Sequence, residues 1–266
     1  ERPRLRYAPQ RIRISTPSLP AGVKSGSVVE GFARLQPPSG PIRPGSYDFA
    51  FESYFDGVGA NGFFLGAPEL VPTSDVPPVG VRFRALSDNI RNAVSERIRL
   101  AIGGPEGEIA AALIVGVRAG IPEPVNESLR RTGLAHILSI SGLHMALVAA
   151  SVMVSLRLGM ALIPGFVARY PAKKYAAAAA PAVISAYLFI SGGEVAAQRS
   201  FIMIAIMLIA LLFDHAALTM RNLALAATVV LVVSPHEVVG PSFQMSFAAT
   251  AALIGAYAAW SQRERR

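Results

Sequence analysis

Short stretches near the start of the chain alternate between polar and apolar residues. Residues 11–15, Arg-Ile-Arg-Ile-Ser, show the period of two that marks a half-buried β-strand. Residues 27–35 predict a second strand, in which Gly31 is expected to form a bulge. Weaker strand candidates follow at residues 49–51 and 63–65. Turn-forming Pro, Gly and Ser separate these stretches, and the spacing predicts a small all-β barrel or sandwich over residues 1–66.

The pattern changes between residues 67 and 131. Residues 66–80 are rich in turn formers and lack periodicity, which is typical of a linker. From residue 84 to 102, apolar residues recur at every fourth position. This predicts an amphipathic helix that lies in a membrane interface or packs on a neighbouring helix. Residues 109–117 are apolar but too few to span a bilayer, so we expect a buried or re-entrant segment.

Long apolar runs from residue 132 to 266 predict a membrane α-helical bundle of about five transmembrane helices. The expected spans are residues 134–156, 175–190, 196–213, 223–233 (extended toward residue 216) and 243–260. The distribution of charge agrees, because residues 1–131 hold 16 Lys and Arg and 13 Asp and Glu, whereas residues 132–262 hold 6 and 3. The predicted fold class is therefore a membrane helical bundle preceded by a small all-β domain.

Basic residues in the short connections between spans predict the orientation in the membrane. Positive and neutral connections alternate along the bundle. This alternation places the C-terminus in the cytoplasm and the β domain outside it, in a multi-pass protein of the inner (plasma) membrane. The basic residues of the connections and the tail are Arg157, Arg169, Lys173, Lys174, Arg221, Arg263, Arg265 and Arg266.

The amino-acid composition indicates which classes of partner the chain suits. The formal net charge is +8, and 22 of the 25 basic residues are Arg, which suits anionic partners such as nucleic acid or lipid headgroups. A genome that favours Arg and Ala accounts for the same composition equally well. There is no Cys, which excludes disulfides and thiolate metal sites. An intermittent basic run is either a phosphate-tracking face or a charged strand edge that resists aggregation, and it consists of Arg2, Arg4, Arg6, Arg11 and Arg13.

Polar residues at the start of the first span are costly in a membrane unless they have partners or a task. Ser141, His144, Ser151 and Ser155 fall on one face of a helix, which predicts a bundle-facing stripe or a water-filled path. Interhelical hydrogen bonding by the serines is the alternative. The run Ser-Ile-Ser-Gly at residues 139–142 is expected to loosen the helix. No carboxylate lies near His136 and His144 in the sequence, so no metal site is expected.

Later spans also begin with polar residues. Glu194 and Arg199 flank the start of the third span, and either form a buried ion pair or leave the Arg to reach the membrane surface. Gln244 and Ser246 open the fifth span, where a helix-end hydrogen bond is the simpler interpretation. Catalytic motifs such as GxSxG or a P-loop are absent from the sequence, so neither enzymatic activity nor a cofactor is expected.

Several of these stretches resemble the signature of the ComEC/Rec2 competence family. The histidine motif is the most specific of them, Gly-Leu-Ala-His at residues 133–136 followed by Ser-Ile-Ser-Gly-Leu-His at 139–144. The others are an arginine-containing helix start at 198–203, Ser234-Pro235, a Phe-Gln-Met-Ser-Phe element at 243–247 with Met in place of Leu, and a turn at 44–48. Their order and spacing agree with the family over roughly residues 27–260.

The resemblance implies an inner-membrane channel component that passes single-stranded DNA into the cytoplasm during natural transformation. It implies an extracytoplasmic OB-like domain over residues 1–66 and an incomplete competence-type transmembrane domain over 132–266. The expected channel-lining residues are His136, Ser139, Ser141, Gly142, His144, Ser151, Arg199, Gln244 and Ser246. The expected DNA-binding face consists of Arg11, Arg13 and Arg34.

The resemblance also implies partners: single-stranded DNA, the lipid bilayer, a DNA receptor and a cytoplasmic motor protein, with a homo-oligomer also compatible. Complete family members often carry a metallo-β-lactamase-like domain, but the sequence has no HxHxDH pattern, so no nuclease activity is expected. Three other interpretations stay open: a small-molecule or ion transporter, an intramembrane hydrolase using Ser141 and His144, and an inert remnant.

Overall fold

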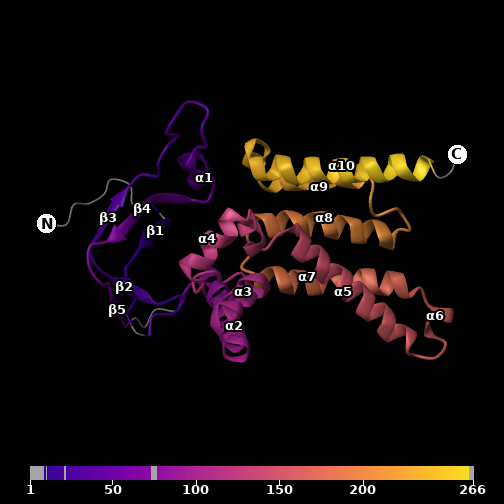
Figure 1. The fold of residues 1–266 in the computed structure, drawn as a ribbon, viewed down its shortest axis with the longest axis horizontal. Coiled ribbons are helices and arrows are strands. Elements are labelled where there is room, and N and C mark those ends of the chain that lie inside the picture. Colours follow the sequence, from indigo (N-terminus) through magenta and orange to yellow (C-terminus); the bar gives the residue numbers. More distant parts are fainter. Residues whose placement is uncertain (1–8, 10, 21, 73–76, 264–266) are drawn as a thin grey trace. The chain divides into compact units, whose positions relative to one another are not determined.

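The structure is a computed structural model, and it divides the chain into two units. We call residues 1–85 the N-terminal unit and residues 86–266 the helical unit (Figure 1). The described residues are 9, 11–20, 22–72 and 77–263. The basic residues that lie outside them are Arg2, Arg4, Arg6, Arg265 and Arg266.

The strands of the N-terminal unit form two separate small sheets in the part that the structure describes. The central strand, β4 (Val58–Phe64), pairs in parallel with β1 (Arg11–Ser15) and antiparallel with β3 (Ala33–Gln36), so this sheet is mixed. The second sheet is the antiparallel pair of β2 (Val28–Glu30) and β5 (Glu69–Val71). β1 confirms a predicted strand, whereas β4 overlaps the weaker candidate at residues 63–65 only at Phe63 and Phe64 and begins earlier than predicted. A closed OB-like barrel is not shown by these strands, and β5 lies inside the stretch predicted as a linker.

The strand predicted over residues 27–35 is divided at Gly31 and Phe32, which separate β2 from β3. The chain leaves one sheet there and joins the other, and this break takes the place of the expected bulge. A Cβ atom on Gly31 would lie 3.0 Å from the Phe64 ring and 3.3 Å from the Cα atom of Pro68. The close approach of β4 and the residues before β5 therefore favours glycine at this position.

The strand predicted at residues 49–51 is wrong, because these residues begin helix α1 (Phe49–Phe55). Asp48 caps the helix: its Oδ1 atom accepts hydrogen bonds from the backbone N–H groups of Ala50 at 2.9 Å and Phe51 at 3.1 Å. The N-terminal unit is therefore a small mixed sheet with a helix, and the all-β prediction is corrected.

The predicted amphipathic helix is confirmed as α2 (Val79–Ile102), and the apolar segment at 109–117 lies mostly in α3 (Gly104–Val115). α2 has buried serines, and the hydroxyl of one of them, Ser87, donates a hydrogen bond to the Phe189 carbonyl at 2.7 Å. Arg91 Nε donates to the Val115 carbonyl at 3.1 Å. The last carbonyls of a helix have no partner within it, so α2 supplies partners for the ends of two other helices.

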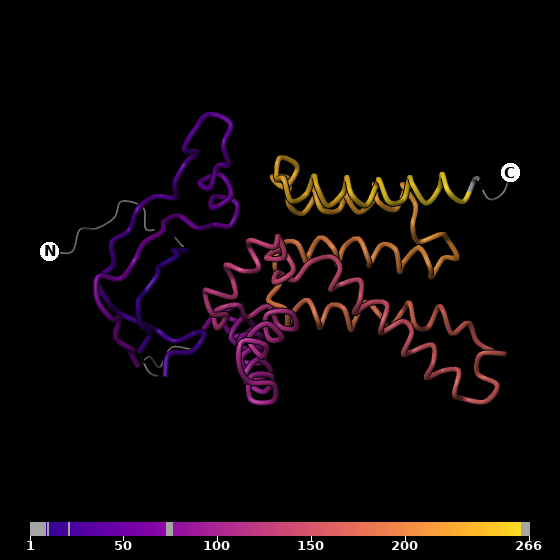
Figure 2. Tube along the Cα trace, in the orientation of Figure 1, coloured from indigo at the N-terminus to yellow at the C-terminus, as the bar shows by residue number. Residues whose placement is uncertain are grey.

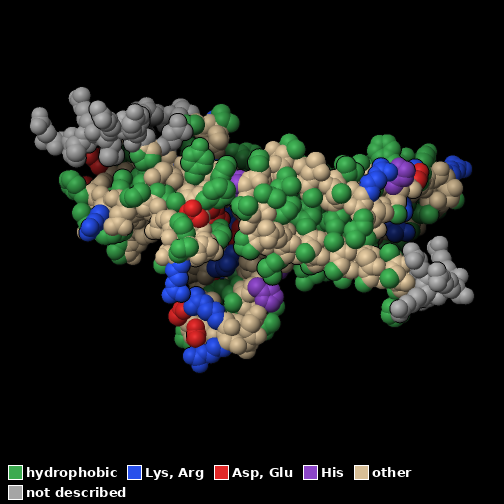
Figure 3. Space-filling view, turned by 90° about the horizontal axis from the view of Figure 1, so that it is seen from above, with side chains coloured by type: hydrophobic (Ala, Val, Ile, Leu, Met, Phe, Trp, Pro, Cys, Tyr) green, Lys and Arg blue, Asp and Glu red, His purple; other side chains and the backbone are tan. Residues whose placement is uncertain are grey.

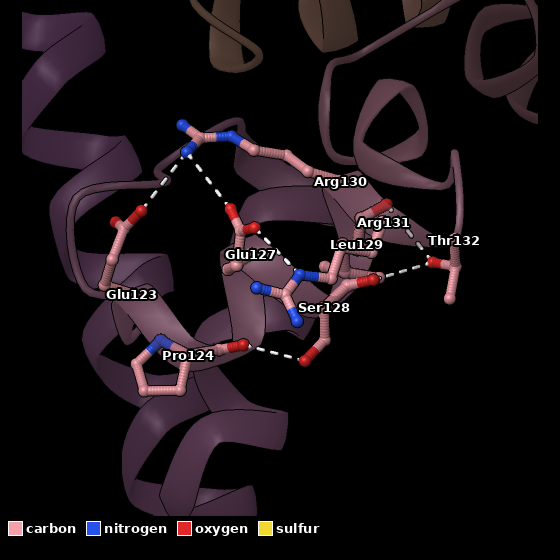
Figure 4. A network of polar contacts seen from close by, with 8 residues as sticks. All are labelled: Glu123, Pro124, Glu127, Ser128, Leu129, Arg130, Arg131 and Thr132. Atoms are coloured by element: carbon pink, nitrogen blue, oxygen red, sulfur yellow. Dashed lines mark hydrogen bonds and ion pairs between the residues drawn. The ribbon is translucent and has the colours of Figure 1, made fainter.

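The acidic and basic side chains of helix α4 (Glu123–Arg131) form ion pairs with one another (Figure 4). The Arg130 guanidinium lies 3.2 Å from the Glu123 carboxylate and 3.9 Å from that of Glu127. Arg131 Nε lies 2.9 Å from Glu127. These pairs are exposed and contribute little to stability. They also neutralise the two arginines at the end of this helix.

Most of the remaining helices of the helical unit run back and forth in similar directions (Figure 2). They are α5 (Gly142–Ala161), α6 (Phe166–Arg169), α7 (Ala172–Ile190), α8 (Val195–Leu212), α9 (Met220–Val233) and α10 (Pro241–Arg263), with 3-10 turns η1 (Ala135–Leu138) and η2 (Pro235–Val239). One apolar cluster joins α5, α7 and α8, and a second joins α8, α9 and α10. α8 is therefore the helix that both clusters share.

Five helices occupy the regions of the predicted spans: α5, α7, α8, α9 and α10. Of the described helices, α5 and α8 are long and apolar enough to cross a membrane, and α9 is a shorter apolar helix. Figure 3 shows charged side chains near the ends of these helices and few along the middle of the visible face. This distribution is typical of helices whose central turns meet lipid.

Candidate functional site

The stretch that carries the histidines is not a continuous helix. Residues Ala135–Leu138 form η1, and Ser139 and Ser141 are extended, so α5 begins only at Gly142. The predicted loosening at residues 139–142 is confirmed, and the first predicted span starts later than residue 134. Such a break leaves backbone N–H and C=O groups without helical partners. Side chains of the same segment form hydrogen bonds with these groups.

His144 and Ser141 close the start of α5 as a capping box. The backbone N–H of Ser141 donates to His144 Nδ1 at 3.2 Å, and the Ser141 hydroxyl lies 3.1 Å from the same nitrogen. Nδ1 therefore accepts, which leaves the hydrogen of the neutral ring on Nε2. His144 takes the place that Glu or Gln fills in most capping boxes.

His136 has the opposite arrangement. Its Nδ1 atom lies 2.8 Å from the Gly133 carbonyl, and because a carbonyl only accepts, Nδ1 carries the hydrogen. The Ser139 hydroxyl donates to the His136 carbonyl at 2.9 Å. His136 is exposed whereas His144 is half-buried. Within the residues that the structure describes, no three His, Cys, Asp or Glu side chains gather into a metal-binding group.

Gly142 brings α5 against the start of α8. A Cβ atom on Gly142 would lie 2.9 Å from the Ser200 hydroxyl oxygen and 3.8 Å from the Ser200 Cβ atom. Ser200 is buried, and its hydroxyl donates to the Ala196 carbonyl at 2.9 Å. Gly142 is thus a packing position of the histidine motif, since any side chain there would displace this hydroxyl.

Arg199, next to Ser200, is 4% exposed. Its Nη1 atom lies 2.7 Å from the Glu237 carboxylate on η2, and Nη2 donates to the Ser242 hydroxyl at the start of α10. Arg199 therefore forms an ion pair, but the predicted pair with Glu194 is wrong, because its acid is Glu237. Glu194 instead pairs with Arg118, at 2.6 Å on the surface.

Gln244 and Ser246 belong to the first turns of α10. The Gln244 amide donates to the Val238 carbonyl of η2 at 3.0 Å, which confirms the helix-end hydrogen bond, and its side chain is exposed. Ser246 is half-buried. Phe243 and Phe247 on either side are buried, with ring centroids 4.4 Å apart. The aromatic residues of this element hold the core, and the polar ones point away from it.

The structure places the helix starts that carry most of the predicted channel residues at one end of the helical unit (Figure 1). His136, Ser139, Ser141, Gly142 and His144 precede or begin α5. Arg199, Gln244 and Ser246 lie in the first turns of α8 and α10. Ser151 is separate, because it lies further along α5 on an exposed flank.

Sequence reasoning missed Glu237, Ser242 and Ser200. Glu237 carried a usable signal: apart from Asp214 it is the only acid between residues 195 and 260. An acid in such an apolar region needs a cation. The contact between Gly142 and Ser200 had no signal in the sequence, because it depends on how two helices approach each other.

The N-terminal unit brings Arg13 and Arg34 to one face of its mixed sheet. Arg13 is paired with Asn61 across β1 and β4. Arg34 is paired with Phe63 across β3 and β4. Paired residues point to the same side of a sheet, and Asn61 and Phe63 are two apart on β4, so all four side chains share one face. Both arginines are exposed, and Phe63 is 46% exposed.

Two further features adjoin this face. A cavity of about 420 Å³ is lined by Arg13 and Asn61 together with Phe49 of α1. Arg11, the third predicted DNA-binding residue, donates to the Asp56 carbonyl at 2.9 Å. Arg11 is therefore partly engaged by its own chain, whereas Arg13 and Arg34 present their guanidinium groups to solvent. The three strands combine cations, amide groups and an aromatic ring on a single surface.

The fold and these groups define a mostly helical protein with candidate membrane spans and a small mixed-sheet unit. Residues 113–266 match the sequence model of the family described as Competence protein, and the chain belongs to this family. This confirms the resemblance to the ComEC/Rec2 competence family. The chain is 22% identical over 233 residues to ComE operon protein 3 of Bacillus subtilis (strain 168), covering 87% of this chain and 28% of that protein. It thus spans less than a third of that relative's length. No solved structure matches the chain.

The contact between Gly142 and Ser200 predicts a pair of coupled substitutions. Gly142→Ala is expected to lower the free energy of unfolding by about 1–3 kcal/mol, because its Cβ atom meets the Ser200 hydroxyl in a packed interface. Adding Ser200→Ala is expected to recover most of that loss, since an ordinary 3.8 Å contact between Cβ atoms remains. Thermal unfolding of the detergent-solubilised chain measures both.

Gly159→Ala on the same helix is the matched control, because nothing lies within 4 Å of its added Cβ atom. It is expected to stabilise α5 by up to about 1 kcal/mol. Strictly additive effects of Gly142→Ala and Ser200→Ala would show that the two positions do not touch.

Proposed function

We propose that this chain takes part in DNA uptake during natural transformation, as a membrane component that passes single-stranded DNA into the cytoplasm. The observation that carries the proposal is its membership of the competence protein family over residues 113–266. The N-terminal unit, an OB-like module in this proposal, receives the strand outside the cytoplasm. The helical unit then forms part of the path across the bilayer.

The mixed sheet has the chemistry that such a strand needs. Proteins hold single-stranded nucleic acid with a positive surface along the phosphates and aromatic rings on which bases stack. Arg13 and Arg34 supply the cations, and Phe63 supplies a ring between them on the same face. Asn61 adds an amide group on the same face. The exposed Phe49 extends the aromatic surface at the cavity next to Arg13.

The helical unit offers polar groups to a passing strand, and in the part that the structure describes no unpaired cation among them would hold a phosphate tightly. Five helices, α5 and α7 to α10, cross the membrane in this proposal, with the C-terminus in the cytoplasm. Arg199, at the end that holds the histidine motif, is neutralised by Glu237 at 2.7 Å. A phosphate passing this end therefore meets hydroxyl, imidazole and amide groups, which bind it weakly enough to release it. The exposed side chain of Gln244 fits this role, and Ser151 would meet the strand further along α5.

Other proteins act together with this chain in DNA uptake. The chain catalyses no reaction here and needs no cofactor. A DNA receptor outside the membrane delivers the strand, and a cytoplasmic motor protein supplies the energy for its movement. Further membrane helices, from a second copy or from other parts of a longer protein, complete the wall of the path.

Binding of single-stranded DNA to the purified full chain tests the role of the sheet face. The logarithm of the association constant falls with the logarithm of salt concentration, with a slope of about −0.7 per phosphate contact. The double variant Arg13→Gln/Arg34→Gln is expected to make this slope shallower by about 1.4, because two contacts are removed. Phe63→Ala is expected to weaken binding by about 1–3 kcal/mol and to leave the slope unchanged, because stacking involves no ions.

Arg82→Gln/Arg97→Gln is the matched control, since both arginines are exposed on α2 and the change in net charge is the same. Its salt slope is expected to equal that of the unmodified chain. If both double variants changed the slope equally, the sheet face would not be the binding surface.

One contact favours a second candidate function, an intramembrane hydrolase. The Ser141 hydroxyl lies 3.1 Å from His144 Nδ1, within the reach of a nucleophile and its base. The backbone N–H of Ser141 donates to the same nitrogen, however, and this is the geometry of a helix cap. The two roles make different demands on residue 144.

His144→Gln separates these roles, because Gln keeps the acceptor of a capping box but cannot act as a base. The channel proposal expects His144→Gln to keep the transformation frequency of competent cells, and His144→Ala to lower it by loss of the cap. Loss of function in both variants, with labelling of Ser141 by a serine-directed probe, would support the hydrolase instead.

A further inference from the structure

The connection between α5 and α7 combines exposed cations with exposed apolar side chains. Arg157 on α5, Arg169 at the end of α6 and Lys173 on α7 are all exposed. Leu162 and Val167 lie between them in the sequence and are 84% and 53% exposed. α6 lies at the end of the helical unit away from α4 (Figure 1). The connection therefore presents both kinds of side chain at one end of the bundle.

No acid lies near this positively charged connection in the sequence. The sequence contains no Asp or Glu between Glu127 and Glu194. Lys174 is the exception among the nearby cations, because it pairs with Asp214 at 2.5 Å. Among the described residues, no ion pair involves any of the three exposed cations of the connection. Their charge is thus available to an anionic partner.

Aromatic residues complete the surface. Phe166, Tyr170 and Tyr175 form a cluster in which ring centroids lie 5.1 to 6.2 Å apart. The two tyrosines are about half exposed, at 49% and 50%. Tyrosine is enriched where a membrane protein meets the headgroups, because its ring is apolar and its hydroxyl is polar. In the sequence, the three rings are interleaved with Arg169 and Lys173.

We propose that the α5–α7 connection (Arg157, Leu162, Val167, Arg169, Tyr170 and Lys173) binds the headgroups of anionic phospholipids. The cations contact lipid phosphates, and the apolar side chains enter the boundary between headgroups and acyl chains. This occupant fits better than nucleic acid, whose backbone would leave Leu162 and Val167 in contact with water. The inference requires only that α5 crosses a membrane, and it does not depend on DNA transport.

The test uses the detergent-solubilised full chain and fluorescent phosphatidylglycerol, with phosphatidylcholine as the neutral comparison. The unmodified chain is expected to bind the anionic lipid more tightly, with an affinity that falls as salt rises. The triple variant Arg157→Gln/Arg169→Gln/Lys173→Gln is expected to lose this preference, by about fivefold in Kd per cation removed. The charge-conserving variant Arg157→Lys/Arg169→Lys/Lys173→Arg is expected to keep most of it.

Arg11→Gln/Arg13→Gln/Arg34→Gln is the matched control, because it removes the same charge from the N-terminal unit. It is expected to keep the lipid preference and to weaken binding of single-stranded DNA. Equal loss of lipid preference in both triple variants would show that only net charge matters and would overturn the proposal. So would a connection variant that loses DNA binding but keeps its lipid preference, because the surface would then serve nucleic acid.

Discussion

The buried ion pair between Arg199 and Glu237 fixes how the two halves of the helical unit meet. α8 belongs to both apolar clusters, and apolar contacts are not directional. The Arg199 guanidinium adds a directional constraint, because a cation that is 4% exposed must keep its partners. Glu237 and Ser242 supply them from η2 and the start of α10. This charge and the apolar cluster together set the register of α8 against α10.

The other polar groups of the helical unit also hold helix ends. His144 caps α5 through the backbone of Ser141, and Gln244 holds η2 against α10. Ser87 of α2 binds a carbonyl in the last turn of α7. Such ends leave backbone groups without partners, and in an apolar environment these groups must be satisfied within the protein. The residues that the family signature suggests for transport therefore also stabilise helix ends. Only a substitution that keeps the hydrogen bond can separate a role in transport from this structural role.

Local patterns predicted the elements whose signals are local. The alternation of polar and apolar residues at 11–15 predicted β1, and the apolar residues at every fourth position predicted most of α2. The Ser and Gly residues at 139–142 indicated the break before α5. The helix at Phe49 was missed because its apolar residues also suit a strand, and the cap at Asp48 decides between them. Partners distant in sequence were not predictable. The acid for Arg199 lies 38 residues away, and the shared face of Arg13 and Arg34 depends on strand register.

The Arg199–Glu237 pair holds α8 against η2 and the start of α10, and a double-mutant cycle on unfolding in detergent is the sharpest test of this role. Arg199→Met and Glu237→Leu are each expected to cost about 3–5 kcal/mol, because each leaves a buried charge without its partner. The double variant is expected to cost far less than the sum, while Arg118→Gln, at an exposed pair, costs about 0–1 kcal/mol. Small effects of the single variants that add in the double variant would show that this pair does not hold the helices together.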